Sequence, residues 1–539
     1  MRLIDVNGLE GHPVITADVC IVGAGAAGIT VATELDRSAH TVCLVESGGY
    51  APEEDTQSLY DIDSIGYPVR ENYMSRARYF GGSCNLWAGR SMKLTALDME
   101  PRPWIPYSGW PIAYAELERY YAKAEKILNL PSFESFEKVI LNQRMSPQES
   151  ALFDNEDLRP NISMWAKKPL RFGAAYQSQL KRSPTISVYL HANATELHLN
   201  AAGTAVASLR IATLHGKAYS IKARQYVLAC GGMENARLLL VSRDVQKQGI
   251  GNQYDVVGRY FMDHPRTVFG RVKLSGAYRL PLLLGIPLAD GMAQMGIQFS
   301  ERMQARERLL NHYLTFERQW SEQTAKAYQS FVHTMKIFLR KGYSGNRFGL
   351  SGGKLATVPE LIYLLAPREL MPHVLYRLLK TVKARISRGV TELIVVNYCE
   401  QAPNPQSRVY LSQERDRLQM NRLVLDWKVT DEETKSLMRL QEVVDSYLQK
   451  THLGRLDNTS QPVADLYYTD ASHHIGTTRM SDDPHTGVVD RDCRVHGVNN
   501  LYIAGSSVFP TSGYVNPTLT IVALGVRLAE HLKKLAGGS

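Results

Sequence analysis

The run ADVCIVGAGAAGITVATEL (residues 17–35) decides the fold of this chain. Its first part is apolar and predicts a buried strand, and its second part has the apolar spacing of a helix. Gly23, Gly25 and Gly28 stand between the two parts in the pattern G-x-G-x-x-G. A second apolar run at residues 41–45 predicts the next strand. Strand, glycine turn, helix and strand form a βαβ unit, which predicts a parallel sheet covered by helices.

The three glycines suit a turn that holds a pyrophosphate. The first permits the tight turn, the second lets the backbone approach the phosphates, and the third lets helix and strand pack closely. Glu46 ends the second predicted strand, where a carboxylate accepts the ribose hydroxyls of an adenosine. An acid at this position disfavours a 2′-phosphate and therefore NADP. The position of the unit near the start of a long chain favours FAD over NAD.

Composition places the chain among ordinary globular proteins. It has 539 residues, of which 44% are hydrophobic and 21% charged, which excludes a fibre, a disulfide scaffold and a disordered protein. A net charge of +9 is small for this length, so we expect a basic soluble enzyme and no nucleic-acid partner. The six cysteines form no C-x-x-C pair, and neither a signal peptide nor a membrane-spanning apolar run is recognisable. We therefore predict free thiols, no metal site and a cytoplasmic location.

Five further blocks resemble the glucose–methanol–choline (GMC) family of flavin oxidoreductases, in the branch near pyranose 2-oxidase. They are GGSCNLWAG (81–89), GWPIAYAELERYYAKAE (109–125), YVLACGGMENARLLL (226–240), VGRYFMDHP (257–265) and HHIGTTRM (473–480) with YIAGSSVFPTSGYVNPTLTIVALGVRLAEHL (502–532). The family implies an α/β fold in which a discontinuous, Rossmann-like FAD-binding domain is interleaved with an α+β substrate domain. An antiparallel sheet of the substrate domain is expected to lie over the flavin.

The order of the blocks predicts two interleaved domains. We expect the FAD-binding domain to comprise residues 1–100, 186–265 and 466–539, and the substrate-binding domain to comprise residues 101–185 and 266–465.

Residues 302–388 are predicted to form a helical insert of the substrate domain. Within it, residues 374–388 carry five basic side chains and no acidic one. A basic amphipathic helix can lie on a membrane surface. We favour a surface helix packed on the substrate domain, and peripheral membrane contact stays the alternative.

The resemblance places the catalytic histidine of the pattern H-x-x-G-T-x-R-M at His473. It places the second catalytic position, His or Asn in the family, at Asn516. A base is needed because hydride removal from an alcohol carbon leaves a protonated carbonyl unless the hydroxyl proton is taken, and neutral imidazole suits that task. An amide cannot act as the base but can hold the substrate oxygen. His474 remains a neighbouring candidate, although its side chain should point elsewhere if the segment is extended.

The resemblance also assigns cofactor contacts beyond Gly23, Gly25, Gly28 and Glu46. The turn along the pyrophosphate and flavin is matched by Gly82, Ser83 and Asn85, and the strand beside the adenine by Ala194. The segment that leads back to the flavin is matched by Gly505 and Ser506, and the start of the last helix by Pro517 and Thr518.

One position departs from the family's branch. Pyranose 2-oxidases attach their flavin through a histidine in a GG-x-x-x-H-W stretch, and the matching residue here is Leu86. Because leucine cannot form that bond, we expect FAD to be bound non-covalently.

The resemblance thus implies FAD-dependent oxidation of a sugar, glycoside or related primary or secondary alcohol. The hydride would pass to flavin N5 and the proton to the histidine, and oxygen or another electron acceptor would reoxidise the flavin. Two other functions remain open on the same fold. One is a non-redox flavoenzyme of the lyase or decarboxylase type, and the other is an electron-transfer flavoprotein subunit.

Overall fold

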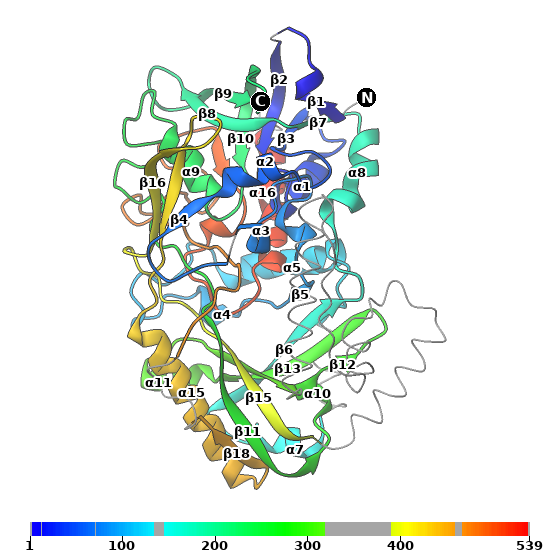
Figure 1. Cartoon of the computed structure of the whole chain (residues 1–539), viewed down its shortest axis with the longest axis vertical. Coiled ribbons are helices and arrows are strands. Elements are labelled where there is room, and N and C mark those ends of the chain that lie inside the picture. Colours follow the sequence, from blue (N-terminus) through cyan, green and yellow to red (C-terminus); the bar gives the residue numbers. More distant parts are fainter. Residues whose placement is uncertain are drawn as a thin grey trace, which may run out of the picture.

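The computed structural model describes residues 3–11, 13–70, 72–133, 145–318, 390–458 and 466–536. Two large sheets lie one above the other along the long axis of the molecule (Figure 1). The first sheet contains, in spatial order, β1 (Leu3–Asp5), β7 (Ile186–Leu190), β3 (Val42–Val45), β2 (Val14–Val22), β10 (Ala218–Leu228), β9 (Val206–Ala212) and β8 (Asn193–Leu199), with β19 (Leu501–Ile503) beside β10.

Strands β1 to β10 of this order run parallel, and β9 and β8 add an antiparallel edge. The predicted βαβ unit is present as β2, α1 (Ala26–Leu35) and β3. Gly23 has a φ of +104°, and a Cβ there would lie 2.5 Å from the carbonyl oxygen of Ala229. The turn between β2 and α1 therefore requires glycine.

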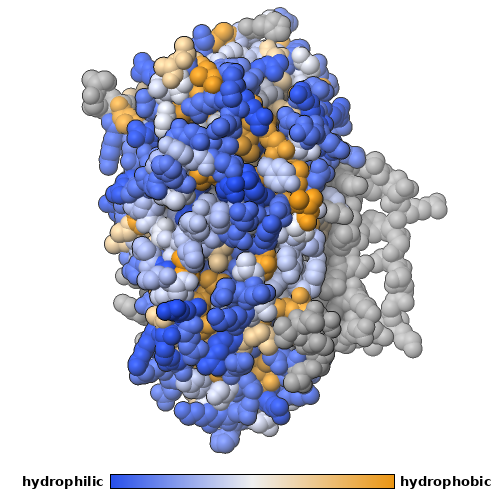
Figure 2. All heavy atoms as spheres, turned by 90° about the vertical axis from the view of Figure 1, so that its left-hand side faces the viewer, coloured by the Kyte–Doolittle hydropathy of each residue, from blue (hydrophilic) through white to orange (hydrophobic). Residues whose placement is uncertain are grey.

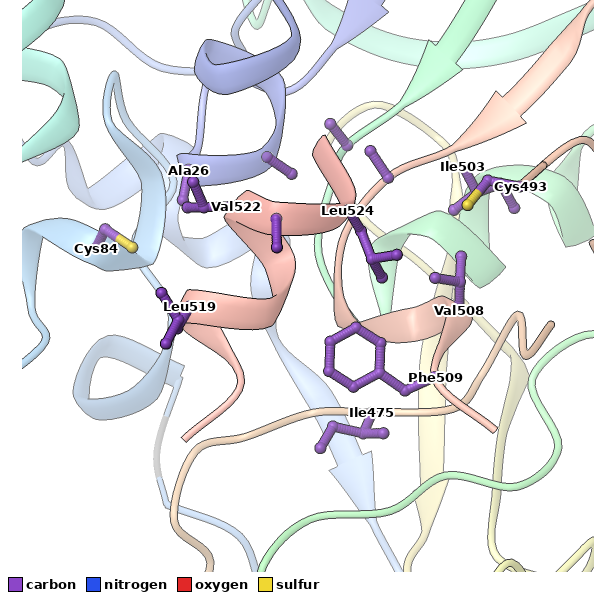
Figure 3. Packing of buried hydrophobic residues seen from close by; sticks show 14 of the residues in the cluster. Ala26, Cys84, Ile475, Cys493, Ile503, Val508, Phe509, Leu519, Val522 and Leu524 are labelled. Atoms are coloured by element: carbon purple, nitrogen blue, oxygen red, sulfur yellow. The ribbon is translucent and has the colours of Figure 1, made fainter. Parts of the chain in front are cut away.

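Helix α16 (Thr518–Ala536) packs against α1 beneath this turn. Both helices are buried on the faces that meet, and Val522 of α16 lies beside Ala26 of α1 (Figure 3). Helix α16 thus joins the first βαβ unit, so this layer of the molecule is built from segments about 500 residues apart in the sequence.

The second large sheet is antiparallel throughout its ordered path. It contains β18 (Gly454–Asp457), β11 (Arg266–Tyr278), β15 (Val390–Tyr398), β14 (Tyr313–Arg318), β13 (Gly291–Phe299), β6 (Leu158–Ala166) and β5 (Arg90–Ser91), with β12 (Ile286–Pro287) beside β13. Because β5 and β6 lie between β3 and β7 in the sequence, the chain passes from the first sheet to the second and back again.

A small third sheet joins β16 (Arg408–Arg415), β17 (Asn421–Asp426) and β4 (Ile62–Ser64). The described residues also form the helices α2 (Glu54–Gln57), α3 (Asn72–Ser75), α4 (Ala96–Met99), α5 (Tyr114–Ile127), α7 (Pro147–Ala151), α8 (Phe172–Arg182), α9 (Glu234–Val241), α10 (Pro281–Leu284), α11 (Glu301–Glu307) and α15 (Asp431–Lys450). Short 3₁₀ turns occupy Val6–Gly8, Ser58–Tyr60, Gly82–Asn85 and Ser506–Val508.

The prediction of a helical insert from residue 302 is wrong in its first part. Helix α11 ends at Glu307, and Tyr313–Arg318 forms β14 between β13 and β15. The first four residues of β14 are all buried, so they lack the alternation that distinguishes a strand from a helix. Residues 319–389, which include the basic stretch 374–388, lie outside the described residues.

Polar side chains cover most of the face shown in Figure 2, and apolar ones form small separate patches. Within the described part of the chain, no helix has both the length and the apolar character needed to cross a membrane.

Candidate active site

A cavity of about 610 Å³ is lined by residues of both large sheets. On its nucleotide side lie the β2–α1 turn, the end of β3 and the start of β8. On its substrate side lie residues of β5, β6, β11, β13, β14 and β15. The loop that carries His473 and the N-terminus of α16 also line it, so one space connects the nucleotide turn with the predicted catalytic residues.

Glu46 is buried at the nucleotide side and is held by the backbone. Its Oε2 accepts the N–H of Ala24 at 3.0 Å, and its Oε1 accepts the N–H of Gly48 at 3.0 Å. Burial raises the pKa of Glu46, and these backbone hydrogen bonds oppose that shift. Each oxygen keeps a second lone pair, so the carboxylate can also accept a ribose hydroxyl.

Where an extended cofactor would lie, parts of the cavity wall are formed by glycine backbone without side chains. A Cβ at Gly231 or Gly505 would meet nothing within 4 Å, and one at Gly25 would come no closer than 3.9 Å to another heavy atom. The N-termini of α1 and α16 meet the same wall, and helix N-termini stabilise the negative charge of phosphates and of a reduced flavin. The residues present therefore fit FAD.

Arg78 is a cavity residue of the nucleotide side that the sequence reasoning missed. Its Nε donates to Ser47 Oγ at 2.7 Å, and its Nη1 lies 3.2 Å from Glu234 Oε2. The guanidinium places a positive charge close to Glu46, where it lowers the pKa of that carboxyl. The residue stands three positions before the block GGSCNLWAG, outside the pattern that carried the resemblance.

His473 and Asn516 come together in the cavity wall. Asn516 Nδ2 lies 3.1 Å from His473 Nε2, and His473 Nδ1 lies 2.8 Å from Nδ1 of His264. Burial lowers the pKa of His473 well below the usual histidine value, and neighbouring positive charges, Arg90 among them, add to this effect. His473 is therefore neutral at pH 7, as a general base requires.

His264 faces His473 because two distant segments pair in antiparallel fashion. The N–H of Met262 donates to the carbonyl of Ile475, and the N–H of Ile475 donates back, which places residue 264 opposite residue 473. Asp263 accepts the N–H groups of His264 and His473 at 2.6 and 3.0 Å. The block VGRYFMDHP contained His264, but nothing in it indicated this contact.

His474 also lines the cavity, but its ring makes no hydrogen bond with His473 or Asn516 in the described structure. Its ring lies 5.9 Å from that of Phe261, and burial lowers its pKa to about 3. Together with Asp263 and Asp470 it forms a group of possible metal-ligand atoms within 4.8 Å of one another. Asp470 is already paired with Arg70 at 3.1 Å, and the absence of a metal from this protein stays a prediction.

The comparisons with known proteins agree with this geometry. Residues 403–525 match a family model described as GMC oxidoreductase. The chain is 23% identical to paromamine 6'-oxidase of Streptomyces fradiae over 95% of its length and 90% of that protein. It is 24% identical to the fructose dehydrogenase large subunit of Gluconobacter japonicus over 96% of its length and 98% of that protein.

Among solved structures, formate oxidase of Aspergillus oryzae has the same fold. The TM-score is 0.52 at 17% identity, covering 97% of this chain and 99% of that one. The comparisons support the GMC oxidoreductase family. The predicted fold class and the assignment as an FAD-dependent oxidoreductase are thereby confirmed, whereas the branch near pyranose 2-oxidase stays a prediction.

Most of the site residues predicted from the sequence line the cavity. His473 and Asn516 do so, and so do Gly23, Gly25, Glu46, Gly82, Ser83, Ala194, Gly505, Ser506, Pro517 and Thr518. Gly28 and Asn85 do not. A Cβ at Gly28 would lie 1.9 Å from the carbonyl oxygen of Gly23, and Asn85 Nδ2 donates to the carbonyl of Phe80 at 3.0 Å.

The substrate side of this cavity combines charged, polar and aromatic groups that no sequence block predicted. The guanidinium of Arg90 lies 4.7 Å from the ring centre of Tyr398 and 5.0 Å from that of Trp165. Burial alone would raise the pKa of Tyr398, but the charges of Arg90 and Arg266 lower it. Gln294, Thr315 and Glu317 complete the polar wall.

Proposed function

We propose that this protein oxidises a CH–OH group of a sugar, a glycoside or a related alcohol, with His473 as the base. The observation that carries the proposal is the contact between His473 Nε2 and Asn516 Nδ2, at 3.1 Å, in a cavity that also contains the nucleotide turn. A neutral base beside an amide donor, close to a cofactor site, is the arrangement that alcohol oxidation needs.

Each side chain then has a separate task. Bound FAD would supply the acceptor for the hydrogen of the alcohol carbon. His473 Nε2 takes the hydroxyl proton, and its lowered pKa keeps this nitrogen free at neutral pH. The amide of Asn516 has two hydrogens, so it can contact the imidazole and still donate to the substrate oxygen.

Sugars fit the substrate side better than simple alcohols do. Trp165 offers an apolar ring, while Thr315 and Gln294 offer polar groups on neighbouring strands of the same sheet. A sugar ring presents the same mixture of apolar and hydroxyl surfaces. The names of both relatives described above support this substrate class, and Asn516 at the second position supports the pyranose 2-oxidase-like branch. Whether oxygen or another acceptor takes the electrons is left open.

The cofactor is proposed to be bound without a covalent link. Leu86 lines the cavity at the position of the attached histidine in pyranose 2-oxidases. The thiols of Cys84 and Cys230 also line it, but burial raises the pKa of each to about 12, so neither is a thiolate at neutral pH. Acid precipitation should release a yellow supernatant, and flavin that stays with the pellet would contradict the proposal.

We also propose a division into two domains and a location in the cell. The division is into an FAD-binding domain (1–100, 186–265, 466–539) and a substrate-binding domain (101–185, 266–465). The location is cytoplasmic, which the six free cysteines support because a reducing compartment keeps thiols unpaired.

A panel of sugars, glycosides and polyols tests the activity. Each compound is mixed anaerobically with the holoenzyme, and bleaching of the flavin absorbance is recorded. The same panel in air, with peroxide detection, separates an oxidase from a dehydrogenase. We expect at least one sugar or glycoside to bleach the flavin faster than methanol or ethanol does. Bleaching by none of them would contradict the proposal and favour a non-redox or electron-transfer role.

A further inference from the structure

We propose that His264 is a positioning residue that fixes the tautomer of His473, so that the bare Nε2 of His473 faces the cavity. The inference rests on the proposed function only where it treats His473 as the base. The tautomer itself is a property of the two rings and can be measured without a substrate.

The backbone carbonyl of Ser512 determines which nitrogen of His264 carries hydrogen. His264 Nε2 lies 3.2 Å from this oxygen, which can only accept, so Nε2 must be the donor. His264 is fully buried, and burial lowers its pKa to about 4, so the ring is neutral and has one N–H. Its Nδ1 is therefore a bare acceptor.

The acceptor at His264 then determines the state of His473. The two Nδ1 atoms are 2.8 Å apart, and a hydrogen bond at this distance requires that His473 Nδ1 carry the hydrogen. With Nδ1 protonated, neutral His473 has a bare Nε2, and the amide of Asn516 donates to it at 3.1 Å. The opposite tautomer of His473 would bring two nitrogen lone pairs into contact and would leave Nε2 unable to accept a substrate proton.

The backbone holds the two rings in this relation. Met262 and Ile475 form an antiparallel bridge, and the side chain of Asp263 accepts the N–H groups of His264 and His473, one from each segment. The contact between His264 and His473 thus depends on fixed main-chain geometry rather than on long, mobile side chains. After His473 takes a proton, its Nδ1–H still donates to His264, so the same acceptor stabilises the imidazolium.

His312 provides a matched control elsewhere in the molecule. It is also buried, its Nε2 donates to the carbonyl of Glu433 at 2.8 Å, and its Nδ1 accepts the N–H of Glu400 at 3.1 Å. Burial lowers its pKa to about 4, as at His264. Replacing His312 therefore removes a similar buried imidazole without touching His473.

Nitrogen-15 NMR of the holoenzyme with labelled histidine tests the tautomer directly. The His473 signals are assigned by their loss in His473→Gln, and protonated and bare ring nitrogens have distinct shifts. We expect a protonated Nδ1 and a bare Nε2 in the wild type and in His312→Leu. In His264→Leu, we expect His473 to become a mixture of the two tautomers. In His264→Asn, we expect His473 to keep its hydrogen on Nδ1, because the Oδ1 of the introduced amide can accept in place of the Nδ1 of His264. A wild-type His473 protonated on Nε2 would overturn the inference without any variant.

The rate of flavin reduction by substrate gives a second readout. His264→Leu should slow reduction by about 10- to 100-fold with little change in substrate affinity, because the base spends less time in its active form. His264→Asn should recover most of that loss, and His312→Leu should leave the rate near the wild-type value. If His264→Asn is as slow as His264→Leu while its NMR tautomer is unchanged, or if His264→Leu reduces at the normal rate, the positioning role is wrong. Absence of any substrate would instead contradict the proposed function, and the NMR result would still stand.

Discussion

The two sides of the cavity are built in different ways. The nucleotide side is built around backbone turns at Gly25, Gly231 and Gly505, and the carboxylate of Glu46 there is held by two main-chain N–H groups. The substrate side is made of side chains, among them Arg90 and Trp165, carried by strands that are distant in the sequence. The first side recognises a common cofactor through shape and dipoles, and the second can change its substrate by changing side chains without altering the fold.

The largest effect is expected where the two sides meet. His473→Ala should reduce the rate of flavin reduction by about 10²- to 10⁴-fold, the usual contribution of a general base. FAD should remain bound, because we expect the cofactor to be held mainly by the backbone of the nucleotide side. Stopped-flow reduction and the flavin absorbance of the purified variant measure the two properties.

His474→Ala is the matched control for that variant. The His474 ring lies beside Phe261, not in the His473–Asn516 pair, so its loss should reduce the rate far less. If His474→Ala reduced the rate of flavin reduction more than His473→Ala does, His474 and not His473 would be the base.

A side chain placed on the nucleotide side should exclude the cofactor. Gly25 has a negative φ, and a Cβ there meets no heavy atom closer than 3.9 Å, so Gly25→Val fits the fold but projects into the cavity. We expect FAD affinity to fall about 100-fold, equivalent to about 2.7 kcal/mol. Fluorescence titration of the apoprotein with FAD measures this, and unchanged affinity would show that the cofactor lies elsewhere.

The third glycine of the same turn should behave differently. A Cβ at Gly28 would lie 1.9 Å from the carbonyl oxygen of Gly23, so Gly28→Ala forces α1 away from β2. The free energy of unfolding of the apoprotein should fall by about 1–3 kcal/mol, the usual effect of overpacking. Urea unfolding without FAD checks this, with Gly25→Val as the control that should keep nearly the wild-type midpoint.

The same contrast explains how much the sequence could predict. The glycines and Glu46 could be predicted because they belong to one short segment of the sequence. Within the turn, the φ angles and the close approach of other backbone atoms leave few alternatives to glycine. His264 could not be assigned, because its contact with His473 depends on two loop segments that meet although they are 209 residues apart in the sequence. The side chains of the substrate side could not be predicted either, because they come from strands that are distant in the sequence. Strand β14 was mistaken for helix because its core positions are buried on both faces.

The smallest effect concerns pH and the state of the base. In the proposed mechanism His473 acts only when deprotonated, so the rate of flavin reduction should rise as pH increases through its pKa and then stay constant. Because burial lowers that pKa, the fall in rate should begin well below pH 6.5. A histidine of ordinary pKa would be about three-quarters protonated at pH 6, whereas we expect the enzyme to keep most of its rate there. The pH profile of kcat/KM measures the pKa of the free enzyme, and a half-maximal rate at pH 6.5 or above would show that the base is not a buried histidine.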